Sequence, residues 1–149
     1  MHSLLRSRTL RISSLLNSSF SRNFTTHPDF SPRLKAPVST AVDLQLKATI
    51  EALIKAHPVV LFMKGNAAQP MCGFSAKSVQ LLQKNSAAFH TEDILKDPKL
   101  RQFMKDFSQW PTFPQLYVKG EFVGGCDIMT QMDGAGDLKE LLKDVPKLA

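Results

Sequence analysis

The chain has 149 residues, of which 43% are hydrophobic, and this favours one folded domain with a tail over a disordered protein. Its two cysteines, Cys72 and Cys126, are too few for a disulfide scaffold or for a four-ligand metal site within one chain. The formal net charge of +6 would favour a nucleic-acid partner, but residues 1–36 carry +5 of that charge. Since the rest of the chain is nearly neutral, we expect no nucleic-acid binding.

Residues 1–36 have the composition of an organelle-targeting segment. They are rich in arginine and serine, contain Asp29 as their only acid, and have no apolar run long enough for a signal peptide or a membrane span. Arg22, three residues before a cleavage site expected near Thr25, favours the mitochondrial matrix over the plastid. The alternative is a basic tail with no targeting role. We assign residues 1–36 to a mitochondrial transit peptide and linker, residues 41–147 to the folded domain, and expect no membrane partner.

The folded part opens with a predicted helix and a buried strand. Apolar residues recur at helical spacing before a break at Pro58, and they are Leu46, Ile50, Leu53 and Ile54. The run V-V-L-F-M at residues 59–63 is rich in β-formers and predicts a central, parallel strand. A polar loop follows, and the next helix is predicted to begin near Cys72.

A second strand and a third helix come next. Residues 88–94 alternate as in a strand, and Asp97 followed by Pro98 is a typical helix start. The segment W-P-T-F-P at residues 110–114 cannot be helical. Beyond it, Q-L-Y-V and E-F-V-G predict a hairpin that turns at Lys119 and Gly120.

The C-terminal part predicts one further helix. Asp137 and Glu140 have the spacing of a capping box, so we expect this helix to begin near Asp137. A helical turn over residues 127–132 should be interrupted by Gly134 and Gly136. The resulting order of helices and strands predicts a small α/β protein, with a mixed sheet covered by helices on both faces.

Cys72 is the residue that points most directly to chemistry. At a helix N-terminus and near Lys64, its thiolate would be stabilised by free backbone N–H groups and by a positive charge, which lowers a thiol pKa. A buried, inert cysteine is the alternative, but the neighbouring glycine and polar loop favour exposure. Ser75 stands where a two-cysteine redox enzyme has its second thiol, so it cannot resolve a mixed disulfide. We expect Ser75 to act chiefly by its inability to form a disulfide.

Three motifs resemble those of the monothiol glutaredoxins. They are K-G-N-A-A-Q-P-M-C-G-F-S at residues 64–75, W-P-T-F-P-Q at 110–115 and G-G-C-D at 124–127, and the resemblance spans residues 42–145. It implies a thioredoxin fold, with a four-stranded mixed sheet flanked by helices, and glutathione as ligand. With the targeting-like N-terminus, the chain resembles the single-domain mitochondrial members in particular.

The resemblance also implies how glutathione would bind. Lys64 and Arg101 would bind one of its carboxylates by charge-assisted pairing. Thr112 and the backbone of Phe113, next to a cis Pro114, would pair with the glutathione cysteine as an added strand does.

The γ-glutamyl end of glutathione would be bound by Gly125, Cys126 and Asp127. Asp127 would accept from the ammonium group, while backbone N–H groups receive the carboxylate. Phe74 is either core filler or an aromatic wall beside the thiol, and its small and polar neighbours favour the wall. Trp110 is expected to be a packing residue outside the site.

Two functions share this predicted site. In the first, which the resemblance implies, two protomers of a homodimer share a [2Fe-2S] cluster, with one thiolate from each Cys72 and one from each bound glutathione. The protein would then carry clusters from mitochondrial assembly factors to recipient apoproteins. In the second, Cys72 is the catalytic nucleophile of a glutathione-dependent thiol–disulfide oxidoreductase that removes glutathione from proteins. A thioredoxin-fold interaction module without either activity is a third alternative. Cys126 would either form a regulatory disulfide with Cys72 or contribute only its backbone.

Overall fold

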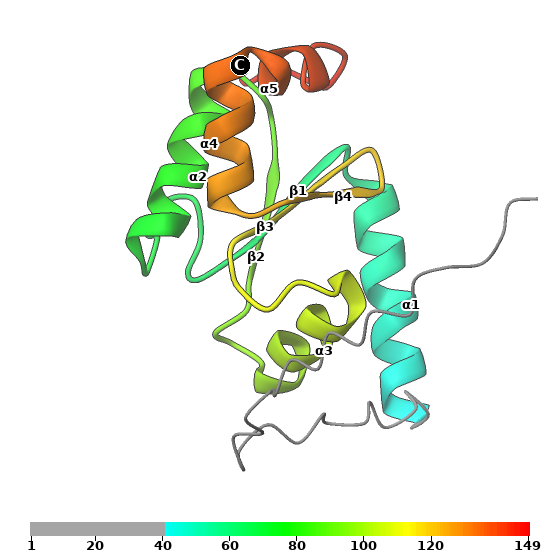
Figure 1. The fold of residues 1–149 in the computed structure, drawn as a ribbon. Helices are drawn as coiled ribbons and strands as arrows, with labels where there is room; N and C mark the ends of the chain where they lie inside the picture. Colours follow the sequence, from blue (N-terminus) through cyan, green and yellow to red (C-terminus); the bar gives the residue numbers. More distant parts are fainter. Residues whose placement is uncertain (1–40) are drawn as a thin grey trace, which may run out of the picture. The chain divides into compact units, whose positions relative to one another are not determined.

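The computed structural model describes residues 41–149, and the targeting segment predicted for residues 1–36 lies outside them. The described part contains five helices and four strands (Figure 1). In chain order these are α1 (Ala41–Ala56), β1 (Val59–Met63), α2 (Gly73–Lys84), β2 (His90–Asp93), α3 (Pro98–Ser108), β3 (Gln115–Val118), β4 (Glu121–Gly124), α4 (Cys126–Ala135) and α5 (Asp137–Leu141). No helix among residues 41–149 has both the length and the hydropathy needed to cross a bilayer.

The four strands form one mixed sheet in the order β2-β1-β3-β4. Strand β1 is interior, as predicted, but it is parallel only to β2 and runs antiparallel to β3. Strands β3 and β4 form the predicted hairpin, with Lys119 at φ 51° and Gly120 at φ 89°. Two left-handed residues in a two-residue turn match the twist of the flanking strands, which explains why a glycine is placed there.

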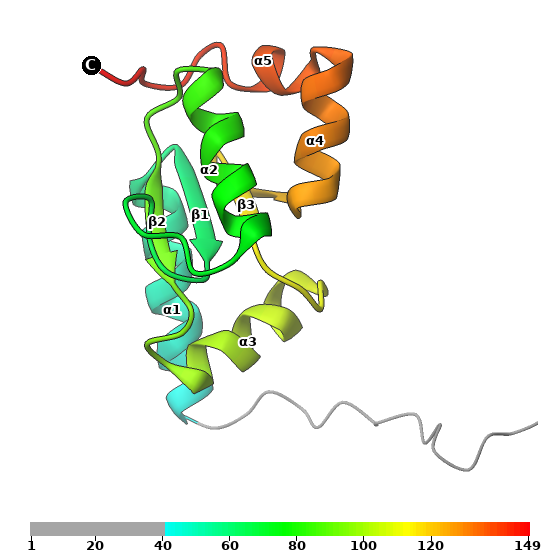
Figure 2. The ribbon, with the colours of Figure 1, turned by 90° about the vertical axis from the view of Figure 1, so that its left-hand side faces the viewer.

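Every residue of β1 is buried, and successive side chains enter two different cores. Val59, Leu61 and Met63 pack against residues of α2, α4 and α5, whereas Val60 and Phe62 pack against residues of α1 and α3. Figures 1 and 2 show the same division, with α1 and α3 on one face of the sheet and the other three helices opposite. A strand covered on both faces has no solvent-facing side, and this is why its sequence does not alternate.

Several local predictions are confirmed and two are wrong. Asp97 caps α3 by accepting from the Lys99 N–H at 2.8 Å, and Pro98 takes the first helical position. The capping box at Asp137 does not form, because Gly136 is the N-cap of α5 and, within residues 41–149, no side chain caps the helix. Helix α4 passes through Gly134 without a break and ends at Ala135, and Gly136, with a φ of 87°, is its left-handed C-cap.

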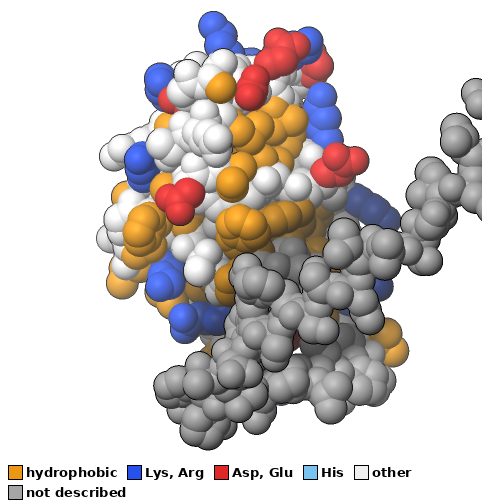
Figure 3. All heavy atoms as spheres, in the orientation of Figure 1, with side chains coloured by type: hydrophobic (Ala, Val, Ile, Leu, Met, Phe, Trp, Pro, Cys, Tyr) orange, Lys and Arg blue, Asp and Glu red, His pale blue; other side chains and the backbone are white. Residues whose placement is uncertain are grey.

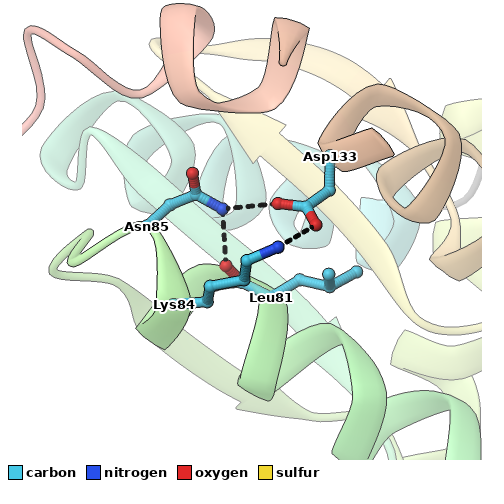
Figure 4. A network of polar contacts seen from close by, with 4 residues as sticks. All are labelled: Leu81, Lys84, Asn85 and Asp133. Atoms are coloured by element: carbon cyan, nitrogen blue, oxygen red, sulfur yellow. Dashed lines mark hydrogen bonds and ion pairs between the residues drawn. The ribbon is translucent and has the colours of Figure 1, made fainter. Parts of the chain in front are cut away.

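Helices α2 and α4 lie side by side, and a polar network joins their C-terminal ends (Figure 4). Lys84 Nζ lies 2.7 Å from one carboxylate oxygen of Asp133, and Asn85 Nδ2 donates to the other oxygen at 3.0 Å. Asn85 Nδ2 also donates to the Leu81 carbonyl at 2.9 Å. The network fixes the spacing of two helices whose opposite ends carry Cys72 and Cys126.

Replacement of Asp133 by alanine should lower the melting temperature at pH 7 by a few degrees. The bonds from Lys84 and Asn85 hold the pKa of Asp133 below its usual range. A carboxyl with a lowered folded pKa stabilises the fold above its unfolded pKa of about 3.9, and this contribution is lost as the pH falls through the folded pKa. Thermal unfolding at pH 7 and pH 3 should therefore show the difference between wild type and variant shrinking in acid. Asp144→Ala, which removes an exposed ion pair with Lys119, is the control and should have little effect at either pH.

Candidate functional site

Cys72 is the N-cap of α2, as its predicted place at the helix start implied. Its backbone is extended, and its Sγ accepts a hydrogen bond from the Ser75 N–H at 3.3 Å. The same sulfur lies 3.2 Å from Ser75 Oγ. The sulfur thus satisfies a free N–H group at the helix start, as a capping side chain does. Because Cys72 is only half-buried, the sulfur also keeps access to solvent.

The surroundings of Cys72 favour its thiolate. Partial burial raises the pKa of the thiol, but hydrogen bonds from the Ser75 hydroxyl and from the Ser75 and Phe74 N–H groups outweigh burial. The positive charge of Lys64 adds to them, and the net effect is a pKa below the usual thiol value.

Ser75 has a larger part than its sequence position suggested. It is fully buried, and its Oγ accepts from the Lys64 backbone N–H at 3.2 Å. With that acceptor site filled, the hydroxyl hydrogen is free to point to Cys72 Sγ once the thiol has lost its proton. Ser75 therefore does more than prevent a disulfide, because it links the sulfur to the end of β1. Its position three residues after the cap, where side chains commonly bond back to the cap, was the signal in the sequence.

Ser75→Ala should raise the pKa of Cys72, because it removes one donor to the thiolate. The rate of alkylation by iodoacetamide, measured against pH in a Cys126→Ser background, should then reach its midpoint at a higher pH and be several-fold slower at pH 7. Ser78→Ala is a matched control, since Ser78 is also a buried serine of α2 and its Oγ has no hydrogen-bond partner among the described residues. Equal profiles for wild type and Ser75→Ala would contradict the assigned role.

The loop between β1 and Cys72 is folded back on itself. The Met71 N–H donates to the Lys64 carbonyl at 2.9 Å, and Gly65 and Pro70 form an isolated bridge. At the tip, Asn66 Oδ1 accepts from two backbone N–H groups of the next turn. Gly65 has a φ of +81°, and a Cβ at this position would lie 2.2 Å from the Gln69 carbonyl oxygen. Only glycine fits there.

A groove of about 150 Å³ lies near the start of α2. It is formed by the first turn of α2, the loop before β3 and the N-terminal end of α4, and the Phe113–Pro114 peptide bond in its wall is cis as expected. Its lining residues are Phe74, Trp110, Thr112, Phe113, Pro114, Gly125, Cys126 and Asp127. Gly125 passes so close to Trp110 that a Cβ would lie 3.1 Å from the indole nitrogen.

Most of the predicted site residues lie together. Seven of them line the groove. Cys72 lies two residues before Phe74, which forms part of the groove wall, and the positive charge of Lys64 helps to lower the pKa of the Cys72 thiol. Arg101 is the exception, because it lines a separate hollow with Ile94, Leu95, Pro98, Gln102 and Lys105. Trp110 packs against Phe122, as expected of a packing residue, but it also lines the groove and so belongs to the site. Its place in the motif that contains the cis proline was the available signal.

The rim of the groove near Cys72 is apolar and exposed. Met71 is 67% exposed and Phe74 62%, which excludes the core-filler interpretation of Phe74. Figure 3 shows apolar side chains at the N-terminal end of α2 among scattered charges. Exposed apolar side chains therefore precede and follow Cys72 along the chain.

Comparison with known proteins identifies the family. The Glutaredoxin family model matches residues 59–123. The mitochondrial monothiol glutaredoxin-S15 of Arabidopsis thaliana is 43% identical over 120 residues, which cover 80% of this chain and 70% of that protein. The mitochondrial monothiol glutaredoxin-5 of Saccharomyces cerevisiae is 41% identical over 138 residues, covering 87% and 92%. The chain belongs to the monothiol glutaredoxins.

Solved structures agree with this glutaredoxin's fold. Reduced poplar apo GrxS14 shares 48% identity and a TM-score of 0.61, covering 66% of this chain and 90% of that one. A buckwheat glutaredoxin–glutathione complex, 20% identical with a TM-score of 0.64, covers 74% of this chain and the whole of the other and supports the fold alone. The thioredoxin fold is thus confirmed. The glutaredoxin spans 22% of the length of two other curated relatives, and its matches include a chloroplastic one.

Proposed function

We propose that this glutaredoxin binds a [2Fe-2S] cluster with glutathione and transfers it to apoproteins in the mitochondrial matrix. The observation that carries the proposal is the single, partly exposed Cys72 thiol, with a lowered pKa and a serine hydroxyl where a second thiol would stand. Such a thiol can donate to a metal without being consumed by a disulfide within its own motif.

Glutathione is the proposed ligand of the groove. Asp127 at its wall is placed to accept from an ammonium group, and the uncapped N-terminal N–H groups of α4 suit a carboxylate. Lys64 supplies positive charge near the sulfur, and Arg101 would have to reach from α3 to join it.

The cluster is cargo, and this chain supplies few of its ligands. Residues 41–149 contain no group of three or more His, Cys, Asp or Glu side chains able to hold a metal. With Cys72 as the one ligand from each chain, a cluster with four thiolates takes its other three from a second protomer and two glutathione molecules. Exposed Met71 and Phe74 give that second protomer an apolar surface beside each Cys72. Thiolate ligands that come from glutathione, which can dissociate, are readily replaced by the cysteines of a recipient protein. This suits a carrier.

The alternative function is glutathione-dependent removal of glutathione from proteins. The Cys72 thiolate would attack the glutathione sulfur of a mixed disulfide and release the protein thiolate. A second glutathione thiolate would then attack the Cys72–glutathione disulfide, giving oxidised glutathione and free Cys72. The lowered pKa of Cys72 favours this chemistry as well. Because Ser75 has no thiol, the Cys72–glutathione disulfide must be resolved by an external thiol, as in this cycle, or by Cys126.

Anaerobic reconstitution with iron, sulfide and glutathione tests the carrier function. The expected result is visible cluster absorbance in a fraction that elutes as a dimer, and its loss when glutathione is omitted. A protein that stays colourless and monomeric would overturn the proposal. Reduction of a glutathionylated peptide at the rate of a two-cysteine glutaredoxin would favour the oxidoreductase instead.

A further inference from the structure

We propose that Asp93 is a positioning residue that fixes Lys64 and its loop against the segment leading to Arg101, and so sets the geometry of the glutathione site. The inference rests on the proposed glutathione ligand. Asp93 is the last residue of β2 and pairs with Met63, the last residue of β1. It stands at the sheet edge from which the loops to α2 and α3 both depart.

One oxygen of the Asp93 carboxylate joins these two loops. Asp93 Oδ1 accepts from the Gly65 N–H at 2.9 Å and from the Leu95 N–H at 3.0 Å. The first bond crosses from β2 to the loop that follows Lys64, and the second closes the turn that leads into α3. The two loops therefore share a single acceptor.

The bond to Gly65 completes the fixation of the Lys64 backbone. The Lys64 N–H donates to Ser75 Oγ, and the Lys64 carbonyl accepts from the Met71 N–H. Both bonds therefore connect Lys64 to residues at or just before the start of α2. The Gly65 N–H is the next group along the chain, and Asp93 ties it to the opposite side. Without Asp93, the loop keeps its internal bonds but loses this hydrogen bond to β2.

The consequence concerns the two cations proposed for one glutathione carboxylate. Lys64 comes just before Gly65, and Arg101 lies in α3, which begins three residues after Leu95. Asp93 thus connects the segments that carry both cations. Two charges converge on one carboxylate only if their separation is fixed, because misplacement of a binding group weakens every bond that it makes.

The acceptor atom, and not the negative charge, carries this role. Asparagine at position 93 would keep an Oδ1 acceptor in the same place and remove the charge. Asp93→Ala removes both. Asp97→Ala is a matched control: Asp97 also lies between β2 and α3 and accepts a backbone N–H, from Lys99 in α3, and it is nearer to Arg101 in the sequence. Among residues 41–149 its carboxylate makes no hydrogen bond to the Lys64 loop.

The test is calorimetric titration of the full chain with reduced glutathione, together with amide hydrogen exchange at Gly65. Asp93→Ala should weaken glutathione binding by at least about fivefold and speed exchange at Gly65. Asp93→Asn and Asp97→Ala should bind within about twofold of wild type. Circular dichroism monitors folding, and if Asp93→Ala does not fold, Asp93→Glu serves instead, because its longer side chain displaces the acceptor.

The remaining outcomes separate the two proposals. Wild-type affinity in Asp93→Ala, or equal weakening in Asp93→Asn or Asp97→Ala, would overturn the role of Asp93 while leaving glutathione as the ligand. Absence of glutathione binding by the wild type would overturn the proposed ligand. The rate of amide exchange at Gly65 would in that case still decide whether Asp93 fixes the loop. Faster exchange in Asp93→Ala would support this role, and an unchanged rate would refute it.

Discussion

Cys72→Ser should abolish cluster binding and, with it, the cluster-dependent dimer. A serine hydroxyl keeps the helix cap but does not ionise near neutral pH, so it offers neither a soft metal ligand nor a nucleophile. The fold should be unaffected, because the cap bond from the Ser75 N–H can be made to an oxygen at position 72. The measurement is cluster absorbance and elution volume after anaerobic reconstitution with glutathione.

Cys126→Ser is the control for this loss. Cys126 is buried at the start of α4, and we expect it to contribute its backbone rather than its sulfur. The variant should therefore form the cluster and the dimer as wild type does. If cluster absorbance persisted in Cys72→Ser and disappeared in Cys126→Ser, Cys126 and not Cys72 would supply the thiolate ligand. This result would contradict the proposed site.

Gly65→Ala should destabilise the protein by about 2–4 kcal/mol and weaken glutathione binding. Alanine is strained at a φ of +81°, and its Cβ would collide with the Gln69 carbonyl oxygen, which is backbone and cannot turn aside. The loop must then shift, and it takes Lys64 and the approach to Cys72 with it. Urea denaturation gives the loss of stability, and calorimetric titration gives the loss of affinity.

Gly120→Ala separates backbone strain from collision. Gly120 has a similar φ of +89°, but a Cβ there would meet nothing within 4 Å. This variant should lose about 1–2 kcal/mol of stability and keep its affinity for glutathione. The contrary result is that Gly65→Ala loses no more stability and no more glutathione affinity than Gly120→Ala does. The close packing of the loop before Cys72 would then contribute to neither stability nor binding.

Local signals in the sequence predicted much of the fold. Asp97 followed by Pro98 identified a helix start, and the hairpin followed from two short β-forming segments around a glycine, because a few adjacent residues decide such features. The antiparallel pairing of β1 with β3 was missed, since it depends on segments more than fifty residues apart. The break expected at Gly134 was also wrong, because burial of Met129 and the neighbouring helix outweighs the modest helix propensity of one glycine.

The site was predicted through its motifs, and the errors have a physical pattern. Phe74, Thr112 and Asp127 were chosen because they lie next to residues with obvious chemistry; they line one groove, and their binding of a ligand stays a prediction. Ser75 and Trp110 were undervalued, since their roles depend on which atoms fold back onto them. Arg101 could not be positioned from sequence, because its distance from the groove depends on how α3 leaves β2.

Trp110 gives the glutaredoxin its own optical reporter. It is the only tryptophan in the chain, and it lines the groove beside Gly125. Fluorescence excited at the long-wavelength edge of protein absorbance therefore comes from Trp110, which lies where the ligand is proposed to bind. Occupancy of the groove can be followed without a label, and a bound coloured cluster would quench the signal by absorbing the emitted light. Loading and unloading could then be timed in a stopped-flow instrument on the unmodified protein.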